Sequence, residues 1–191
     1  EATMDEEGYT PLITDSELER TYAPVGEHSG LVVMGIDPAA GGDKSAIVVR
    51  GAHSLQVVFN QRLNDTMDLC GVAYELYRRY GCTMAMVDKT GVGQGVYDKL
   101  KSMGMEVRGV HFGAKATNDA YKNFKAELFW NLRKWLLSGG KLMRNEAWSE
   151  FNIVKYKSLN ERQVEIQPKV QLLKRGLPSP NVADAAALTF A

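Results

Sequence analysis

The chain has 191 residues, of which 45% are hydrophobic, and it carries equal numbers of acidic and basic side chains. This length and composition suit a single globular domain with a substantial hydrophobic core. The sequence contains no apolar run near the length of a membrane span and no signal-peptide pattern, so we expect a soluble protein without a membrane partner.

Charge is distributed unevenly along the chain. Residues 1–30 contain eight acidic residues and a single base, whereas residues 31–191 contain 22 basic and 15 acidic residues, a net charge of +7. We therefore expect an acidic linker segment at 1–30 and a basic folded domain at 31–191. A basic domain fits a polyanionic partner such as DNA, although a solvated lysine surface explains the same charge equally well.

The first 30 residues carry one helical signal. Thr14 or Asp15 can cap a short helix, and Pro24 interrupts the pattern after it. The chain begins with Glu1 and stops at Ala191 inside a helical pattern, so we expect a domain excised from a longer protein.

The next part of the sequence predicts a sheet. Three strand-like runs follow one another, at 31–36, 46–50 and 55–59. The turns between them are short enough for hairpins, which predicts a three-strand antiparallel meander. A helix, a strand, a second helix and a second strand then alternate, at 67–80, 83–87, 96–103 and 105–110. This alternation predicts parallel strands on the far half of a mixed sheet and an α/β fold.

The remainder is mainly helical. An amphipathic pattern predicts a long helix over 120–137, which Gly139 and Gly140 end. We expect a shorter helix near 146–154, a hairpin around 160–161 and a final helix that includes the small residues near 184.

Three aspartates stand where apolar elements rarely carry charge. Asp37 and Asp88 each end a strand-like apolar run, and Asp184 shares a helix face with Ala187 and Leu188. Such carboxylates are costly to desolvate unless they are paired or bind a cation. Because a site of carboxylates alone selects hard cations, the three predict a site for two Mg²⁺ or Mn²⁺ ions.

Ordinary structural roles are open for each of these residues. Asp37 can be a turn aspartate, and Asp184 can complement the dipole of its own helix. Asp88 precedes a glycine-rich turn at 91–95 that matches neither a Walker-type loop nor a dinucleotide fingerprint, so a nucleotide site there is disfavoured.

Basic residues concentrate after residue 100, with 15 bases against seven acids between 101 and 180. Such a surface can follow a DNA backbone without reading its sequence. The bases that we predict to contact DNA are Lys89, Lys115, Lys122, Lys155, Lys157, Lys169, Lys174 and Arg175.

The aspartates belong to longer motifs. These are GIDPA at 35–39 with GDKS at 42–45, MVD at 86–88 with GVG at 91–93, and SPNVADA at 179–185. In content and order they resemble the nuclease domain of the large terminase subunit of tailed bacteriophages, from about residue 31 to the end. The third motif is the most specific. One departure is Asn181, where the family often has aspartate.

The resemblance implies a ribonuclease H-like fold, with a mixed sheet of five or more strands and helices on both faces. It implies a metal-dependent endonuclease that cuts concatemeric viral DNA during genome packaging into a procapsid, by two-metal phosphodiester hydrolysis. Asp37, Asp88 and Asp184 carry over as catalytic, metal-binding carboxylates, with Asp37 bridging both ions by fold analogy. Asp43 is an auxiliary metal candidate.

The same resemblance implies partners and a location. These are double-stranded DNA, the small terminase subunit and the portal protein, in the cytoplasm of the infected bacterial host. The packaging ATPase of such proteins has no counterpart in this sequence, which lacks a Walker-type lysine loop. The acidic segment at 1–30 is then expected to be the linker that follows the ATPase domain.

Other functions fit parts of the same pattern. A Holliday-junction resolvase or integrase-type nuclease of the same fold would prefer branched DNA. An actin-like or sugar-kinase-like ATPase module would need a second phosphate loop, which the sequence lacks. A catalytically idle DNA- or portal-docking domain would bind DNA without cutting it.

Overall fold

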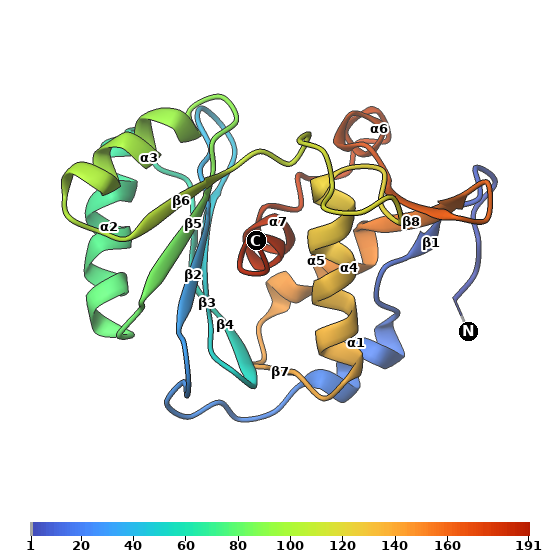
Figure 1. Cartoon of the computed structure of the whole chain (residues 1–191), viewed down its shortest axis with the longest axis horizontal. Coiled ribbons are helices and arrows are strands. Elements are labelled where there is room, and N and C mark those ends of the chain that lie inside the picture. The colour runs from blue at the N-terminus through green and yellow to red at the C-terminus, as the bar shows by residue number, and fades with distance from the viewer. Residues whose placement is uncertain (1) are drawn as a thin grey trace.

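The computed structural model describes residues 2–191. Its central feature is a six-stranded sheet in the order β6-β5-β2-β3-β4-β7 (Figure 1). The strands are β2 (Val33–Asp37), β3 (Ser45–Arg50), β4 (Ser54–Gln61), β5 (Met84–Asp88), β6 (Val107–Val110) and β7 (Lys141–Leu142).

Two kinds of connection set the strand directions. Short turns join β2, β3 and β4, so these strands pair antiparallel. Helical crossovers lead from β4 to β5 and from β5 to β6, and β2, β5 and β6 run parallel. The short β7 adds to the far edge, parallel to β4. The expected meander with parallel strands beyond it is confirmed.

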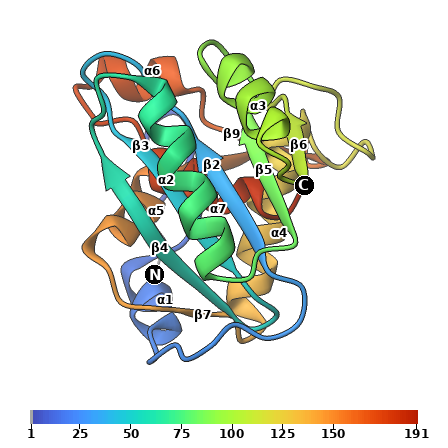
Figure 2. The ribbon, with the colours of Figure 1, turned by 90° about the vertical axis from the view of Figure 1, so that its left-hand side faces the viewer.

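Helices cover both faces of this sheet. α2 (Thr66–Arg79) and α3 (Gly93–Ser102) lie on one face, in front of the sheet in Figure 2. On the other face lies α7 (Asn181–Leu188), with α4 (Phe124–Leu137) beyond it in Figure 1. The sheet therefore separates two hydrophobic cores, and its side chains contribute to both. Ile36 packs towards α2, whereas Val48 packs towards α4 and α7.

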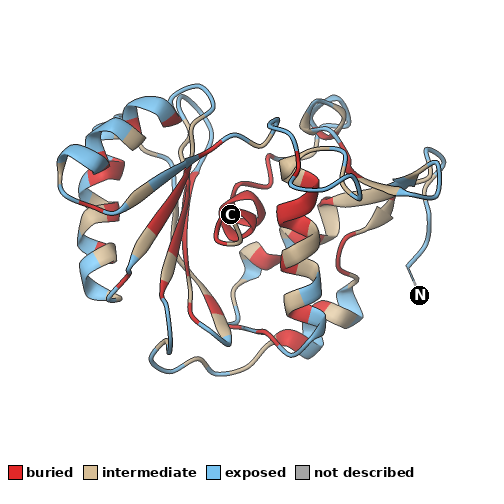
Figure 3. Ribbon diagram, in the orientation of Figure 1, coloured by how far each residue is buried: buried red, intermediate tan, exposed pale blue. Residues whose placement is uncertain are grey.

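The C-terminal helix α7 is the most enclosed element. All of its residues are buried, as Figure 3 shows for the ribbon at the centre of the molecule. A side chain at Gly35 in β2 would put its Cβ 2.0 Å from the carbonyl oxygen of Ala185 and 2.9 Å from Cγ2 of Thr189. Glycine therefore lets the backbones of strand and helix touch directly.

Several element boundaries differ from the sequence patterns, and two have a clear cause. α4 begins at Phe124, not near residue 120, because the Asn123 side chain accepts a hydrogen bond from the Ala126 amide at 3.0 Å and caps the helix there. β6 begins at Val107, not at residue 105, because its pairing with β5 starts at that residue.

The N-terminal segment is packed into the fold, although the sequence suggested a linker. β1 (Thr10–Pro11) pairs with β8 (Lys155–Leu159), which pairs with β9 (Gln163–Ile166) in a second, three-stranded sheet. The hairpin expected around residues 160–161 joins β8 to β9. Apolar side chains hold the segment, since Leu12 and Ile13 are fully buried.

Short helices complete the chain. α1 (Asp15–Thr21) is capped by Thr14 in a capping box with Glu17. The others are η1 (Glu146–Ser149), α5 (Glu150–Ile153) and α6 (Lys169–Lys174). Within residues 2–191, no helix is both long enough and apolar enough to cross a membrane.

The contact at Gly35 yields a stability prediction. Gly35→Ala should lower the free energy of unfolding by about 3 kcal/mol, because the new Cβ meets backbone atoms of α7 that must shift. Gly71→Ala is the matched control: a Cβ at this exposed position in α2 has nothing within 4 Å, so the variant should be neutral or slightly more stable. Urea denaturation of both variants checks this, and equal stabilities would contradict it.

Candidate active site

Two of the predicted acidic residues meet at one edge of the sheet. Asp37 ends β2 and Asp88 ends β5. These strands are parallel neighbours, with Ile36 paired to Val87, so both aspartates lie at their carboxyl ends. Asp37 is only 6% exposed. Asp88 is half-buried, and its Oδ1 accepts a hydrogen bond from the Thr90 amide at 2.9 Å.

Asp184 reaches the same region from the opposite layer. It lies in the first turn of α7, next to Ala185, whose carbonyl touches Gly35 two residues before Asp37. Asp184 is 4% exposed, and its Oδ1 makes no hydrogen bond within residues 2–191. The structure thus brings together the three aspartates that the sequence singled out.

Burial and mutual repulsion dominate the electrostatics of this cluster. Burial raises the pKa of Asp37 well above its usual value, and the nearby charges of Asp184 and Asp88 raise it further. Burial also raises the pKa of Asp184, and the charge of Asp88 adds to this effect. In this arrangement the cluster therefore favours protonation of Asp37 and Asp184.

Two lysines oppose this effect. Lys125 from α4 forms an ion pair with Asp184, with its Nζ 3.6 Å from Oδ1, and the lysine side chain is only 18% exposed. The positive charges of Lys125 and Lys169 both lower the pKa values of Asp37 and Asp184. Lys125 also lies over the rings of Phe112 and Phe129, at 5.3 and 5.7 Å from their centroids.

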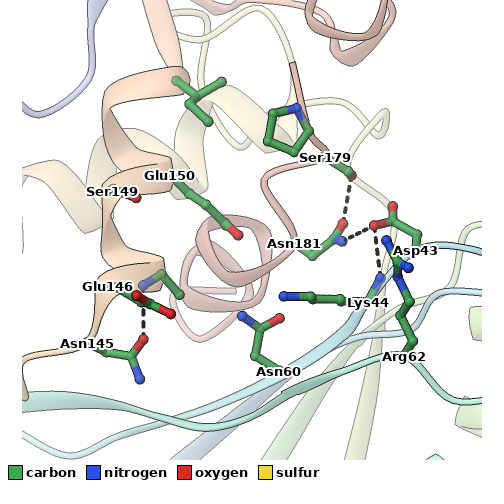
Figure 4. Close-up of a pocket in the computed structure, with 13 residues that line it drawn as sticks. Asp43, Lys44, Asn60, Arg62, Asn145, Glu146, Ser149, Glu150, Ser179 and Asn181 are labelled. Carbon is green, nitrogen blue, oxygen red and sulfur yellow. Dashed lines mark hydrogen bonds between the residues drawn. The ribbon is translucent and has the colours of Figure 1, made fainter. Parts of the chain in front are cut away.

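Asp43 lies on the turn between β2 and β3. It is exposed, and its Oδ1 accepts hydrogen bonds from Nδ2 of Asn181 at 2.8 Å and from the Lys44 amide at 2.9 Å. The Asn181 side chain also accepts a hydrogen bond from the Ser179 hydroxyl at 2.7 Å. These bonds join the β2–β3 turn to the start of α7 (Figure 4). A neutral amide at position 181 donates to Asp43 where a second carboxylate would repel it.

A cleft of about 420 Å³ adjoins this bridge. Asp43, Lys44, Arg62, Glu150 and Asn181 are among its lining residues, and Figure 4 shows them around one hollow. The three clustered aspartates are not among them. The cleft and the aspartate cluster are therefore neighbouring features on either side of the Asp43–Asn181 hydrogen bond.

Glu150 connects this cleft to α7. Its Oε2 accepts a hydrogen bond from the Ala183 amide at 2.8 Å, although it belongs to α5. The N-terminal residue flanking α7 is Pro180, which makes no side-chain cap, so Glu150 supplies one from another element. Burial raises the pKa of Glu150 to about 7, opposed by the Ala183 hydrogen bond and reinforced by the charge of Asp184.

The predicted DNA-contacting bases fall into two groups. Lys122 and Lys157 pair with Glu165, Lys155 pairs with Asp5 at 2.9 Å, and Arg175 pairs with Glu7 at 3.2 Å. Within residues 2–191, the remaining four form no ion pair, and these are Lys89, Lys115, Lys169 and Lys174. Lys89 lies over the ring of Tyr97, 4.4 Å from its centroid.

The donor set suits a hard divalent cation. Its side-chain ligands would be carboxylates, and Oδ1 of Asp184 is a buried acceptor without a hydrogen bond within residues 2–191, which a cation would satisfy. Within residues 2–191, no three acidic, histidine or cysteine side chains are already close enough to hold one ion. The residues therefore fit a cation in chemistry, and their side chains would have to draw together around it.

Solved structures with the same arrangement of elements are large-terminase nucleases. The nuclease domain of the large terminase subunit gp2 of bacterial virus Sf6 superposes with a TM-score of 0.81 and 18% identity, over 94% of this chain and 98% of that chain. The large terminase nuclease of thermophilic phage G20c with bound magnesium gives 0.63 and 17%, over 92% and 94%. The nuclease domain of Thermus phage P74-26 gives 0.58 and 15%, over 92% of both chains.

The chain has the fold of a large-terminase nuclease domain. The resemblance read from the motifs and the ribonuclease H-like architecture are confirmed at the level of the fold. No protein-family profile and no curated protein sequence matches the chain. Solved structures of the Sf6 domain include forms with manganese and with calcium, and those of the G20c domain include forms with magnesium and with cobalt.

Sequence reasoning missed two residues of this candidate site. Lys125 shares a helix face with Phe129 and Leu132, and a lysine on the buried stripe of an amphipathic helix is a usable signal. Glu150 gave no signal, because its partner is a backbone amide 33 positions away.

The raised pKa of Asp37 gives a stability prediction for the metal-free protein. An acidic group whose pKa is higher in the folded than in the unfolded state lowers the stability of the fold as pH rises. The loss begins near the unfolded pKa, about 4, and continues up to the folded pKa. Asp37→Asn should therefore raise the melting temperature without divalent ions, and the gain should grow as pH rises above about 4. Thermal unfolding in chelator measures this, and a less stable variant at the higher pH would refute it.

The tertiary cap of α7 gives a second prediction. Glu150→Ala should lower the free energy of unfolding by about 1–3 kcal/mol, because buried amides of α7 lose their acceptor. Glu150→Gln keeps an acceptor oxygen and should retain most of the stability. It should also remove the loss of stability that Glu150 contributes as pH rises from 4.5 to about 7. Denaturant unfolding at several pH values tests both, and equal losses for alanine and glutamine would disprove the cap.

Proposed function

We propose that the chain is a metal-dependent endonuclease that cuts double-stranded DNA by two-metal phosphodiester hydrolysis. The observation that carries the proposal is the buried Asp184, whose Oδ1 makes no hydrogen bond within residues 2–191 and has the charge of Lys125 3.6 Å away. Asp184 lies near the strand ends that bear Asp37 and Asp88, since its charge acts on Asp37 and the charge of Asp88 acts on it. The fold likeness to terminase nucleases solved with manganese, magnesium or cobalt supports the same chemistry.

Each side chain has a role in this proposal. Bound Mg²⁺ or Mn²⁺ ions would activate water and neutralise the charge that develops on the phosphate. Asp37 is proposed as the ligand common to both ions, because β2 pairs with β5 and packs against α7. Asp88 and Asp184 would each help to hold one of the two ions, and Asp43 is the auxiliary candidate for a metal ligand. Lys125 offsets the negative charge of Asp184 until a cation binds.

The biological role follows from the likeness to terminases. The proposed substrate is concatemeric viral DNA, cut during genome packaging in the cytoplasm of the infected bacterial host. The proposed partners are the small terminase subunit and the portal protein. Of the bases without an ion pair within residues 2–191, Lys169 is proposed to contact the DNA beside the aspartates, since its charge acts on Asp37 and Asp184.

Cleavage of supercoiled plasmid with Mg²⁺ or Mn²⁺ tests the proposal. Asp37→Asn, Asp88→Asn and Asp184→Asn should each reduce the rate by about a hundredfold or more, because each removes a charged ligand. Asp98→Asn, which changes an exposed acid of α3, is the matched control and should cut at the wild-type rate.

The outcomes separate the alternatives. Full cleavage by all three variants would sink the proposal. Preference for a four-way junction over linear duplex would indicate a resolvase-like nuclease. Salt-sensitive DNA binding by the wild type, without divalent-dependent cutting, would indicate an idle docking domain.

A further inference from the structure

The short helix α6, between β9 and α7, exposes apolar side chains that the proposed chemistry does not use. Val170 is 56% exposed and Leu173 is 54% exposed, while Leu172 is 3% exposed and anchors the helix to the body. Val170 and Leu173 are three residues apart, so they lie on the same face of the helix. Two exposed aliphatic side chains on one short helix form a small apolar ridge.

This ridge lies beside the candidate active site. Figures 1 and 2 both place α6 at the end of the molecule that carries the loops after β2 and β5. Those loops follow Asp37 and Asp88. Lys169, the first residue of α6, is close enough for its charge to act on Asp37 and Asp184. A ligand bound across the aspartates would therefore meet α6 at their rim.

The charges around the ridge indicate a polyanion. Lys169 and Lys174, at the two ends of α6, form no ion pair within residues 2–191. By contrast, acidic side chains already neutralise Lys155 and Lys157 on the second sheet. Lysines without an acidic partner on either side of aliphatic side chains complement a nucleic-acid groove. In such a groove, charged phosphates border the apolar faces of the sugars.

We propose that α6 is a duplex-DNA contact element, with Val170 and Leu173 against the sugar walls of the minor groove and Lys174 on an adjoining phosphate. This inference rests on the proposed nuclease function, because it names how the duplex lies beside the aspartates. It also assigns the DNA path to α6 and away from the ion-paired face of β8 and β9.

Fluorescence anisotropy with a labelled duplex, in chelator and over a range of salt, tests this contact. The double variant Val170→Ser with Leu173→Ser should weaken binding by about tenfold and leave the salt slope unchanged, because it removes apolar contact only. Lys174→Ala should reduce the salt slope by about one phosphate contact. All three positions are exposed, so folding should be unaffected.

Matched controls come from distant surfaces. Leu137→Ser changes a residue that is 47% exposed at the far end of α4, and Lys99→Ala changes an exposed base on α3. Both should bind DNA like the wild type. If the double serine variant binds DNA with wild-type affinity, the role of α6 is overturned. A variant that keeps this affinity but loses self-association in light scattering would show that the ridge contacts a second copy of the chain instead.

The failure of this inference is distinguishable from failure of the nuclease proposal. If the wild type cuts plasmid with Mn²⁺ and the serine variant binds and cuts equally well, only the contact through α6 is wrong. If the wild type neither binds nor cuts duplex DNA, the nuclease proposal fails and the inference fails with it.

Discussion

The direct contact between α7 and β2 is the constraint on which the site depends. Gly35 has no side chain, so the backbone of the helix can rest on the strand at Ala185. The small residues of α7 extend this contact, and all of them are buried. Because Asp184 is next to Ala185, the packing that closes the core also sets where its carboxylate lies relative to Asp37. The packing of the core therefore determines the geometry of the candidate site in this fold.

The distribution of charge divides the surface into two regions. On the second sheet, acids of the N-terminal segment and Glu165 neutralise the lysines, so this face is held together by ion pairs. At the aspartate edge, like charges are gathered. Among residues 2–191, Lys125 alone forms an ion pair with one of the three aspartates, Asp184. Such a cluster weakens the isolated fold, and strain of this kind is characteristic of sites whose charge is completed by a ligand.

Much of the fold could be read from the sequence, because its strands and helices follow clear periodicity and short turns. Local patterns predicted the meander and the parallel strands, which the structure contains. They also singled out the three aspartates, which the structure places in one region. The packing of residues 9–22 could not be read, since Tyr9, Leu12 and Ile13 are too few to show a period and find their partners far along the chain. Glu150 was invisible for the same reason, because a side chain that caps a distant helix leaves no local pattern.

The enclosed position of α7 has a consequence for the dynamics of the site. Amides of a fully buried helix exchange with solvent through global unfolding, whereas those of the largely exposed loop after Asp88 can exchange through local opening. The aspartate cluster therefore joins a buried helix to an exposed loop. A ligand shared by Asp184 and Asp88 would tie the loop to the helix and slow exchange at Thr90 and its neighbours, with little change at Ala185.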